Sequence, residues 1–125
     1  MRPSALAPSP AAFLLALAAC GTVQAADASR GKELYESRCA GCHSLDQDRI
    51  GPHHRGVIGR KAGAVEGFEY SPALRASRIV WSARTLDAWL ANPERLIPGQ
   101  RMNYSVPDAV DRAALIVYLE ANPGP

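Results

Sequence analysis

The stretch Cys39-Ala40-Gly41-Cys42-His43 decides how the rest of this chain is interpreted. In the pattern CxxCH, each cysteine thiol can add across one vinyl group of a haem and form a thioether bond. Two intervening residues let both thiols reach the same macrocycle, and the adjacent histidine is positioned to bind the iron through an imidazole nitrogen. The motif therefore predicts covalent attachment of one c-type haem.

Other interpretations of the cysteine pair have to be weighed against haem. A zinc site needs two further ligands, but Cys20 lies in the N-terminal segment, and the adjacent His53 and His54 lack zinc-ligand spacing. A thioredoxin-like redox dithiol belongs among strands that alternate with helices, a pattern that this chain lacks. Two thiols in an exported protein usually form a disulfide, but the histidine after the second cysteine favours haem.

Residues 1–25 have the pattern of an export signal. Residues 11–19 form an apolar run that is too short to span a bilayer. The sequence Val23-Gln24-Ala25 predicts cleavage before the next residue, whereas Leu17-Ala18-Ala19-Cys20 fits a bacterial lipobox, in which Cys20 would carry a lipid. We favour cleavage after Ala25 and predict a periplasmic protein, with a lipid anchor at Cys20 as the alternative.

The remaining chain, residues 26–125, is predicted to form one small domain. So small a domain buries little surface of its own, and an apolar haem would enlarge its core. The full chain carries 14 Lys and Arg against 12 Asp and Glu, so it is nearly neutral. Nothing in this charge balance suggests binding to nucleic acid.

The hydrophobic periodicity predicts an all-α domain with four helices and no clear strand. The first helix is capped at Asp27 or Ser29, ends near Ala40, and presents an inward stripe of three residues. These are Gly31, Leu34 and Tyr35. A second helix, residues 72–76, follows Ser71 as N-cap and has proline at its first position.

The third helix begins after Ser82 and stops at Asn92-Pro93, since a residue before proline avoids the helical region. One face carries Leu86, Trp89 and Leu90. The next segment, residues 94–106, is expected to be irregular.

A last helix is predicted after Ser105-Val106-Pro107-Asp108, which has the form of a capping box with Asp in place of Glu. Its apolar face is expected at residues 110, 113, 114, 117 and 118. Residues 44–69 show no convincing period, and a long loop of this kind can wrap the edge of a haem.

Met102 is the candidate for the second axial ligand of the iron. It is the only methionine after the predicted signal and lies on a segment without helical periodicity, residues 97–102. Methionine at the sixth position of a haem iron raises the reduction potential. The alternative is that Met102 fills a gap in the core. Its irregular loop, in a chain with a haem motif, favours the ligand.

The sequence resembles small bacterial class I cytochromes c over nearly all of residues 28–120. The resemblance rests on the order and spacing of seven segments. They are CAGCH at 39–43, Gly51-Pro52 through GVIGR at 56–60, GFEYSPA at 67–73, Ile79-Val80-Trp81, LANP at 90–93, Ile97-Pro98-Gly99 up to Met102, and LIVYL at 115–119. It implies the all-α class I cytochrome c fold, with long loops wrapped around one covalent haem c per chain.

The resemblance also implies individual roles. His43 is the proximal iron ligand and Met102 the distal one, while the Pro52 carbonyl accepts the other ring N–H of His43 and raises its basicity. Gly31 and Tyr118 correspond to the close crossing of the first and last helices.

Three further residues correspond to positions that bind the haem propionates. Arg60 supplies a guanidinium that pairs with carboxylate, and Tyr70 and Trp81 supply a phenol and an indole donor. The alternative is a surface arginine and two core aromatic residues.

The sequence departs from the family pattern at two positions. His54 stands where many relatives carry an apolar residue, and we expect it to be a satisfied or exposed histidine. Together with His53 it lies near the Gly-Pro loop, on the His43 side of the ring in this family, so neither is a good rival to Met102. Trp89 replaces the usual tyrosine near the distal ligand.

The function that this reading implies is one-electron transfer between periplasmic or membrane-associated redox partners by a monomer, without catalysis at a six-coordinate iron. Candidate partner contacts are Arg38, Arg101 and Tyr104. Membrane contact is expected only if Cys20 is lipidated. The rival functions are a peroxidase, a haem subunit of a dehydrogenase, and a gas sensor with a weak sixth ligand.

Overall fold

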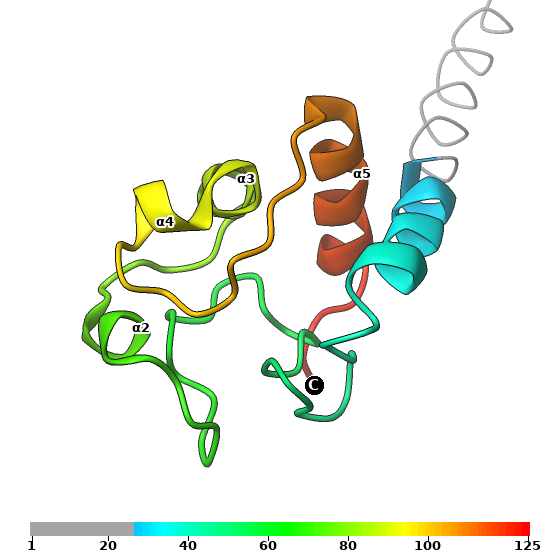
Figure 1. Cartoon of the computed structure of the whole chain (residues 1–125). Coiled ribbons are helices and arrows are strands. Elements are labelled where there is room, and N and C mark those ends of the chain that lie inside the picture. The colour runs from blue at the N-terminus through cyan, green and yellow to red at the C-terminus, as the bar shows by residue number, and fades with distance from the viewer. Residues whose placement is uncertain (1–26) are drawn as a thin grey trace, which may run out of the picture.

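The first helix that the structure describes, residues 27–38, packs across the last one, and this crossing organises the domain (Figure 1). The structure is a computed structural model that describes residues 27–125. The predicted signal peptide and the Cys20 lipobox lie outside these residues. Within the described part, no helix is both long enough and apolar enough to cross a membrane.

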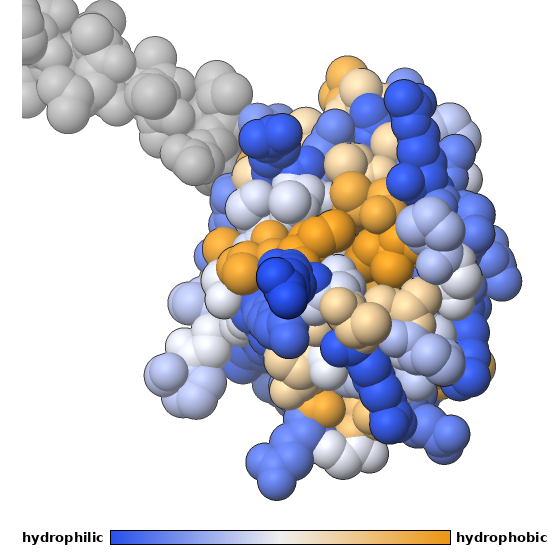
Figure 2. Space-filling view, turned by 90° about the vertical axis from the view of Figure 1, so that its left-hand side faces the viewer, coloured by the Kyte–Doolittle hydropathy of each residue, from blue (hydrophilic) through white to orange (hydrophobic). Residues whose placement is uncertain are grey.

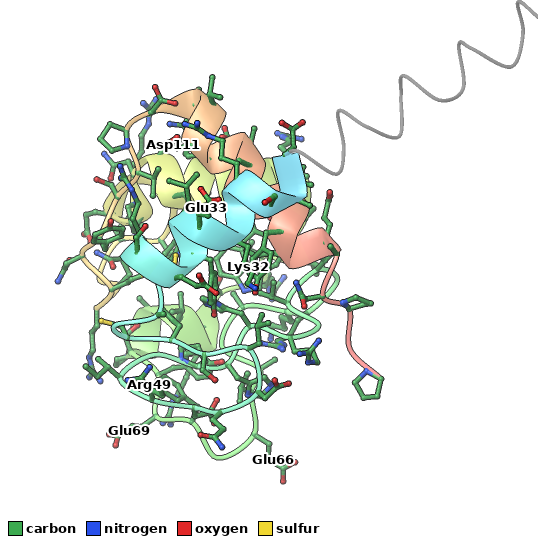
Figure 3. The ribbon with its side chains drawn as sticks, turned by 90° about the vertical axis from the view of Figure 1, so that its right-hand side faces the viewer. Lys32, Glu33, Arg49, Glu66, Glu69 and Asp111 are labelled. Atoms are coloured by element: carbon green, nitrogen blue, oxygen red, sulfur yellow. The ribbon has the colours of Figure 1, made fainter. Side chains whose placement is uncertain are left out.

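The helix crossing depends on a glycine. A Cβ atom added to Gly31 would lie 2.1 Å from the carbonyl oxygen of Ala114 and 2.7 Å from Cβ of Tyr118. The absence of a side chain therefore lets the two backbones approach closely. Beside this contact, Arg30 forms a 2.6 Å ion pair with Asp111, a residue that Figure 3 labels at the crossing. The inward stripe expected for the first helix is confirmed, with Gly31 and Tyr35 buried and Leu34 half-buried.

The last helix, α5 (Ala109–Glu120), begins at a different cap from the predicted one. Its N-cap is Asp108, whose carboxylate accepts the N–H groups of Val110 and Asp111 at 2.8 and 2.9 Å. The prediction of a capping box that begins at Ser105 is therefore wrong. The chain before Asp108 is drawn away from a helical path, because the Val106 N–H donates to the Leu90 carbonyl at 2.8 Å.

The predicted face of α5 is also partly wrong. Val110 and Ala113 are exposed, and the buried positions are Asp111, Ala114, Leu115, Ile116 and Leu119. The helix packs against two elements, the first helix on one side and α3 on another. Its buried stripe is therefore wider than that of a surface helix, and it includes an aspartate because arginines pair with it.

The two predicted middle helices are confirmed. In α2 (Pro72–Ala76), Ser71 is the N-cap and its hydroxyl accepts the Leu74 N–H at 3.1 Å. In α3 (Ala83–Ala91), Ser82 forms a reciprocal capping box with Thr85, and the predicted face buries Leu86 and Trp89.

A further helix, α4 (Pro93–Leu96), lies in the segment expected to be irregular. Asn92 ends α3 and also caps α4, because its side chain accepts the Arg95 N–H at 3.0 Å. The proline that stops one helix occupies the first position of the next, where it loses no hydrogen bond. Of the described residues, the only strand-like pairing is an isolated antiparallel bridge between Lys61 and Val80.

The core lies between α3, α5 and the loop that residues 44–69 form. Val106 and Leu115 are fully buried, and the rings of Trp81 and Trp89 pack with centroids 5.4 Å apart. Apolar residues gather in a patch on the face that carries α2 and α4 (Figure 2). At the edge of the core, half-buried apolar residues include Cys39, Leu74, Leu96 and Met102. The structure thus brings the CxxCH motif and the candidate distal ligand to one core.

Candidate functional site

The CxxCH motif forms a turn that continues the first helix. The N–H groups of Cys39 and Ala40 both donate to the carbonyl of Tyr35, at 2.8 and 3.0 Å. Within the motif, the N–H groups of Cys42 and His43 donate to the Cys39 carbonyl at 3.1 and 2.9 Å. This turn places both thiols and the imidazole on one short rigid segment. Cys39 is half-buried, Cys42 is exposed, and both are free.

Burial raises the pKa of the Cys39 thiol to about 11. A redox dithiol needs the opposite shift, because the thiolate is the reactive form. In residues 27–125 no three His, Cys, Asp or Glu side chains gather closely enough to hold a metal ion. The Cys39 thiol thus lacks the activation that a redox dithiol uses.

The imidazole of His43 is held in one orientation. Its Nδ1 lies 2.8 Å from the Pro52 carbonyl oxygen, the contact that the family resemblance implies. A carbonyl can only accept a hydrogen bond, so Nδ1 carries the proton and Nε2 keeps a free lone pair. Burial of the ring lowers the pKa of His43, which favours the neutral form that binds a metal.

Glycine at position 51 is required by this arrangement. A Cβ atom on Gly51 would lie 2.1 Å from Cε1 of His43, so a side chain there would displace the ring. The Gly51 N–H donates to the Cys42 carbonyl at 2.8 Å, which joins the Gly-Pro segment to the CxxCH turn. The sequence pattern identified Gly51 but not its steric role.

Arg49 also supports the turn, and sequence reasoning missed it. Its guanidinium donates to the carbonyl of Ala40, between the two cysteines, at 2.5 Å. Figure 3 shows Arg49 on the loop below the first helix. No periodicity or motif in the sequence marks this contact, since it joins a loop residue to a backbone atom nine positions away.

His54 packs directly on the predicted proximal ligand. The rings of His43 and His54 are stacked, with centroids 4.0 Å apart and planes 23° from parallel. Its Nδ1 lies 3.0 Å from the Tyr35 hydroxyl, so the ring has a polar partner. Burial, and then the neighbouring His43, hold the pKa of His54 well below its usual value. His53 has a different partner, since its Nδ1 lies 2.8 Å from Oδ1 of Asp48.

Two of the three predicted propionate ligands, Arg60 and Trp81, are joined by backbone pairing. The Trp81 N–H donates to the Arg60 carbonyl at 2.9 Å, beside the Lys61–Val80 bridge. The Arg60 guanidinium donates to the carbonyls of His53 and Arg55 at 2.7 and 2.5 Å. Burial lowers the pKa of Arg60, and nearby Tyr70 counteracts that shift.

Tyr70 and Trp81 have other contacts in the described structure. The Tyr70 hydroxyl accepts the Val65 N–H at 3.2 Å, and the Trp81 ring packs on that of Trp89. Both aromatic residues are buried. The group thus offers one cation and two aromatic side chains on adjoining segments.

Met102 lies on the irregular segment between α4 and α5. A tight turn opens this segment, in which Gly99 has φ of 90° and the Gln100 N–H donates to the Ile97 carbonyl at 3.2 Å. Pro98 and Gly99 occupy the two central positions that a type II turn prefers. Met102 itself is half-buried against the core, as is Cys39.

The chain is similar to several known proteins. It fits the family described as cytochrome c over residues 28–122. Cytochrome c 2.1 of Caenorhabditis elegans is 42% identical over 101 residues, covering 78% of this chain and 91% of that protein. The cytochrome c-type cyt cy of Rhodobacter capsulatus is 40% identical over 99 residues, covering 78% of this chain but only 50% of that longer protein.

Solved structures agree with the sequence comparison. Cytochrome cH from Methylobacterium extorquens superposes with a TM-score of 0.72 at 32% sequence identity. The match covers 75% of this chain and 97% of that one. The shared arrangement of helices is therefore that of the predicted all-α fold.

Proposed function

Since this chain belongs to the cytochrome c family, we propose that it carries single electrons between redox proteins, with His43 and Met102 as the axial ligands. Members of this family bind one haem c covalently, and the spacing of Cys39 and Cys42 fits that attachment. When bound, the haem supplies an iron centre that accepts and donates one electron.

The observation that carries the proposal is the setting of His43. Its Nδ1–H donates to the Pro52 carbonyl, and Gly51 leaves the space that the ring occupies. This support fixes the ring, leaves Nε2 free and raises the basicity of the ligand. The two thiols lie in the same turn. These residues fit a covalently attached haem with a proximal histidine.

Met102 supplies the distal ligand in this proposal. A thioether is a soft, neutral donor, so it favours the ferrous over the ferric state and raises the potential. With both axial positions occupied by protein, no site remains for a substrate at the iron, which argues against a peroxidase.

Arg60, Tyr70 and Trp81 are proposed to hold the haem propionates. Arg60 is already ordered by two carbonyl groups, so its positive charge lies at a defined place. Such an arginine stabilises a carboxylate through a charge-assisted hydrogen bond.

Partner proteins are proposed to dock around the exposed edge of the haem. Arg101 and Tyr104 are exposed next to the distal ligand, and Arg38 lies next to Cys39. Part of the Arg38 charge is engaged, because its guanidinium lies 3.5 Å from Asp111. Because the chain is nearly neutral, electrostatic steering of partner proteins would come from local charged patches of this kind.

We propose that residues 1–25 are removed and that the mature protein is a periplasmic monomer. It would carry electrons in the respiratory chain. A lipid anchor at Cys20 is the alternative. Pull-down with the purified holoprotein, followed by reduction assays with the captured redox proteins, would identify its electron donor and acceptor.

The visible spectrum tests the ligation. Ferric iron bound by methionine sulfur has a weak far-red charge-transfer band, and we expect that band together with slow binding of CO to the ferrous protein. Rapid CO binding without the band would instead favour a gas sensor. Retention of electron transfer only inside a complex with a catalytic subunit would favour a dehydrogenase subunit.

A further inference from the structure

Two residues with left-handed backbone conformation flank Met102. Gly99 has φ of 90°, and Asn103 has φ of 49°, the only positive value for a non-glycine residue in the part of the chain described. This conformation is strained for most side chains, although asparagine tolerates it better than others. It persists only when surrounding contacts hold it. Contacts with surrounding residues must therefore hold Asn103, which directly follows the distal ligand, in this conformation.

The Gln100 side chain supplies the contacts. Its Nε2 donates to Oδ1 of Asn103 at 2.7 Å and to Oε2 of Glu94 at 3.1 Å, and its Oε1 accepts the Asn103 N–H at 2.8 Å. Both amide hydrogens and the amide oxygen are thus used. Gln100 is 6% exposed, whereas Glu94 and Asn103 are exposed, so the Gln100 amide is shielded from water and loses stabilising free energy if its partners are removed.

Glu94 connects this amide to a helix. One carboxylate oxygen accepts the Gln100 amide, and the other accepts the Gly99 N–H at 3.0 Å. Because Glu94 lies in α4, the loop is tied to a helix that packs on α3. At the far end, the Val106 N–H bonds to the Leu90 carbonyl of α3. Met102 therefore lies between two anchored points.

We propose that Gln100, clamped between Glu94 and Asn103, is a positioning residue that keeps the Met102 sulfur on the iron. This inference rests on the proposed function, in which Met102 is the distal ligand. The clamp spans the ligand, joining the residue two positions before it to the residue after it. It limits excursions of the sulfur, and so it limits access of external ligands to the sixth position.

Imidazole binding to the ferric holoprotein tests the clamp. In Gln100→Ala we expect roughly tenfold tighter apparent imidazole binding, since about 1.4 kcal/mol of lost ligand stabilisation is a factor of ten. The far-red band should weaken and the reduction potential should fall. Gln47→Ala is the matched control, because Gln47 is exposed and only its backbone N–H has a described hydrogen bond.

Conservative changes separate positioning from simple destabilisation. Gln100→Glu sets two carboxylates against each other and should loosen the ligand. The double variant E94Q/Q100E restores the amide–carboxylate pair between positions 94 and 100, but not the bond donated to Asn103 Oδ1, and should recover the wild-type imidazole affinity and band in part. Asn103→Gly keeps access to the left-handed backbone but removes Oδ1, so it should show an intermediate effect.

Several outcomes separate this inference from the proposed function. If Gln100→Ala and Gln47→Ala bind imidazole equally and keep the wild-type band while Met102→Ala loses it, the clamp is refuted and the ligand assignment stands. If Met102→Ala itself changes neither the band nor the potential, the ligand assignment fails and the clamp fails with it. If Gln100→Ala yields no holoprotein, failure of E94Q/Q100E to improve on Gln100→Glu refutes the clamp.

Discussion

The imidazole rings of His43 and His54 are stacked, with their centroids 4.0 Å apart. The family resemblance implies an apolar residue at position 54, and His54 is accommodated there because the Tyr35 hydroxyl lies 3.0 Å from its Nδ1. The charged form is disfavoured there, because burial and the adjacent His43 both lower the pKa of His54. The neutral imidazole of His54 can thus occupy a buried position that would also suit an apolar side chain.

His54 should make the stability of the holoprotein depend on pH. Its pKa in the folded state lies below the unfolded value of 6.5, so the unfolded state binds a proton first. Stability is therefore full above pH 6.5 and is lost as the pH falls below that value. Denaturant unfolding at several pH values should show a shallower loss in His54→Leu than in wild type. His53→Ala is the control, and equal slopes for wild type and His54→Leu would reject the prediction.

Covalent attachment of haem should require both cysteines. We expect Cys39→Ser combined with Cys42→Ser to abolish it and to leave little folded protein, because so small a domain depends on the haem for its core. Denaturing gels stained for haem peroxidase activity measure the first effect. A stained band from the double variant would contradict the attachment site.

Met102→Ala should retain the haem but lower the reduction potential by on the order of 0.1 V, within the roughly 0.8 V that axial ligands span. Removal of a soft donor favours ferric iron, and the open position should bind CO or imidazole readily. Redox titration and ligand binding measure these changes. His53→Ala and His54→Ala should alter the potential much less. Larger shifts from either histidine than from Met102→Ala would overturn the assignment.

Gly31→Ala should destabilise the domain by on the order of 1–3 kcal/mol, since the new methyl group meets the backbone of α5. Its Cβ would lie 2.1 Å from the Ala114 carbonyl oxygen. Gly41→Ala is a matched control, because a Cβ there meets nothing within 4 Å. Denaturant unfolding of the two holoproteins gives the comparison. Equal stabilities would show that the helices can separate without cost.

The cellular location can be decided with Cys20. We expect wild type and Cys20→Ala to fractionate alike, as soluble periplasmic proteins, because cleavage after Ala25 removes the cysteine. Fractionation followed by immunoblotting is the measurement. A membrane-bound wild type with a soluble Cys20→Ala variant would establish the lipid anchor instead.

Local sequence signals predicted much of the fold. Ser71 and Ser82 cap their helices as expected, because a hydroxyl needs only the N–H groups of the next turn. The cap of α5 was placed at Ser105 instead of Asp108, because the path of the chain there depends on Val106 bonding to α3. The predicted apolar face of α5 was partly wrong for a related reason, since both the first helix and α3 pack against α5.

Helix α4 was not predicted from the sequence, because proline can both end one helix and begin the next. The residue before Pro93 leaves the helical region, which ends α3, yet proline is favoured at the first position of a helix. Only the capping contact from Asn92 to Arg95 decides that a new helix begins at once.

The sequence by itself determined the chemistry of this protein, because the spacing in Cys39-Ala40-Gly41-Cys42-His43 is a property of neighbouring residues. Only the tertiary structure decided how the ligands are held. The Gly51 cradle, the Arg49 contact and the Gln100 clamp join loop residues through backbone atoms and single amides, which leave no periodic pattern in the sequence. Such contacts depend on the path that each loop takes in the folded protein, because that path decides which groups meet.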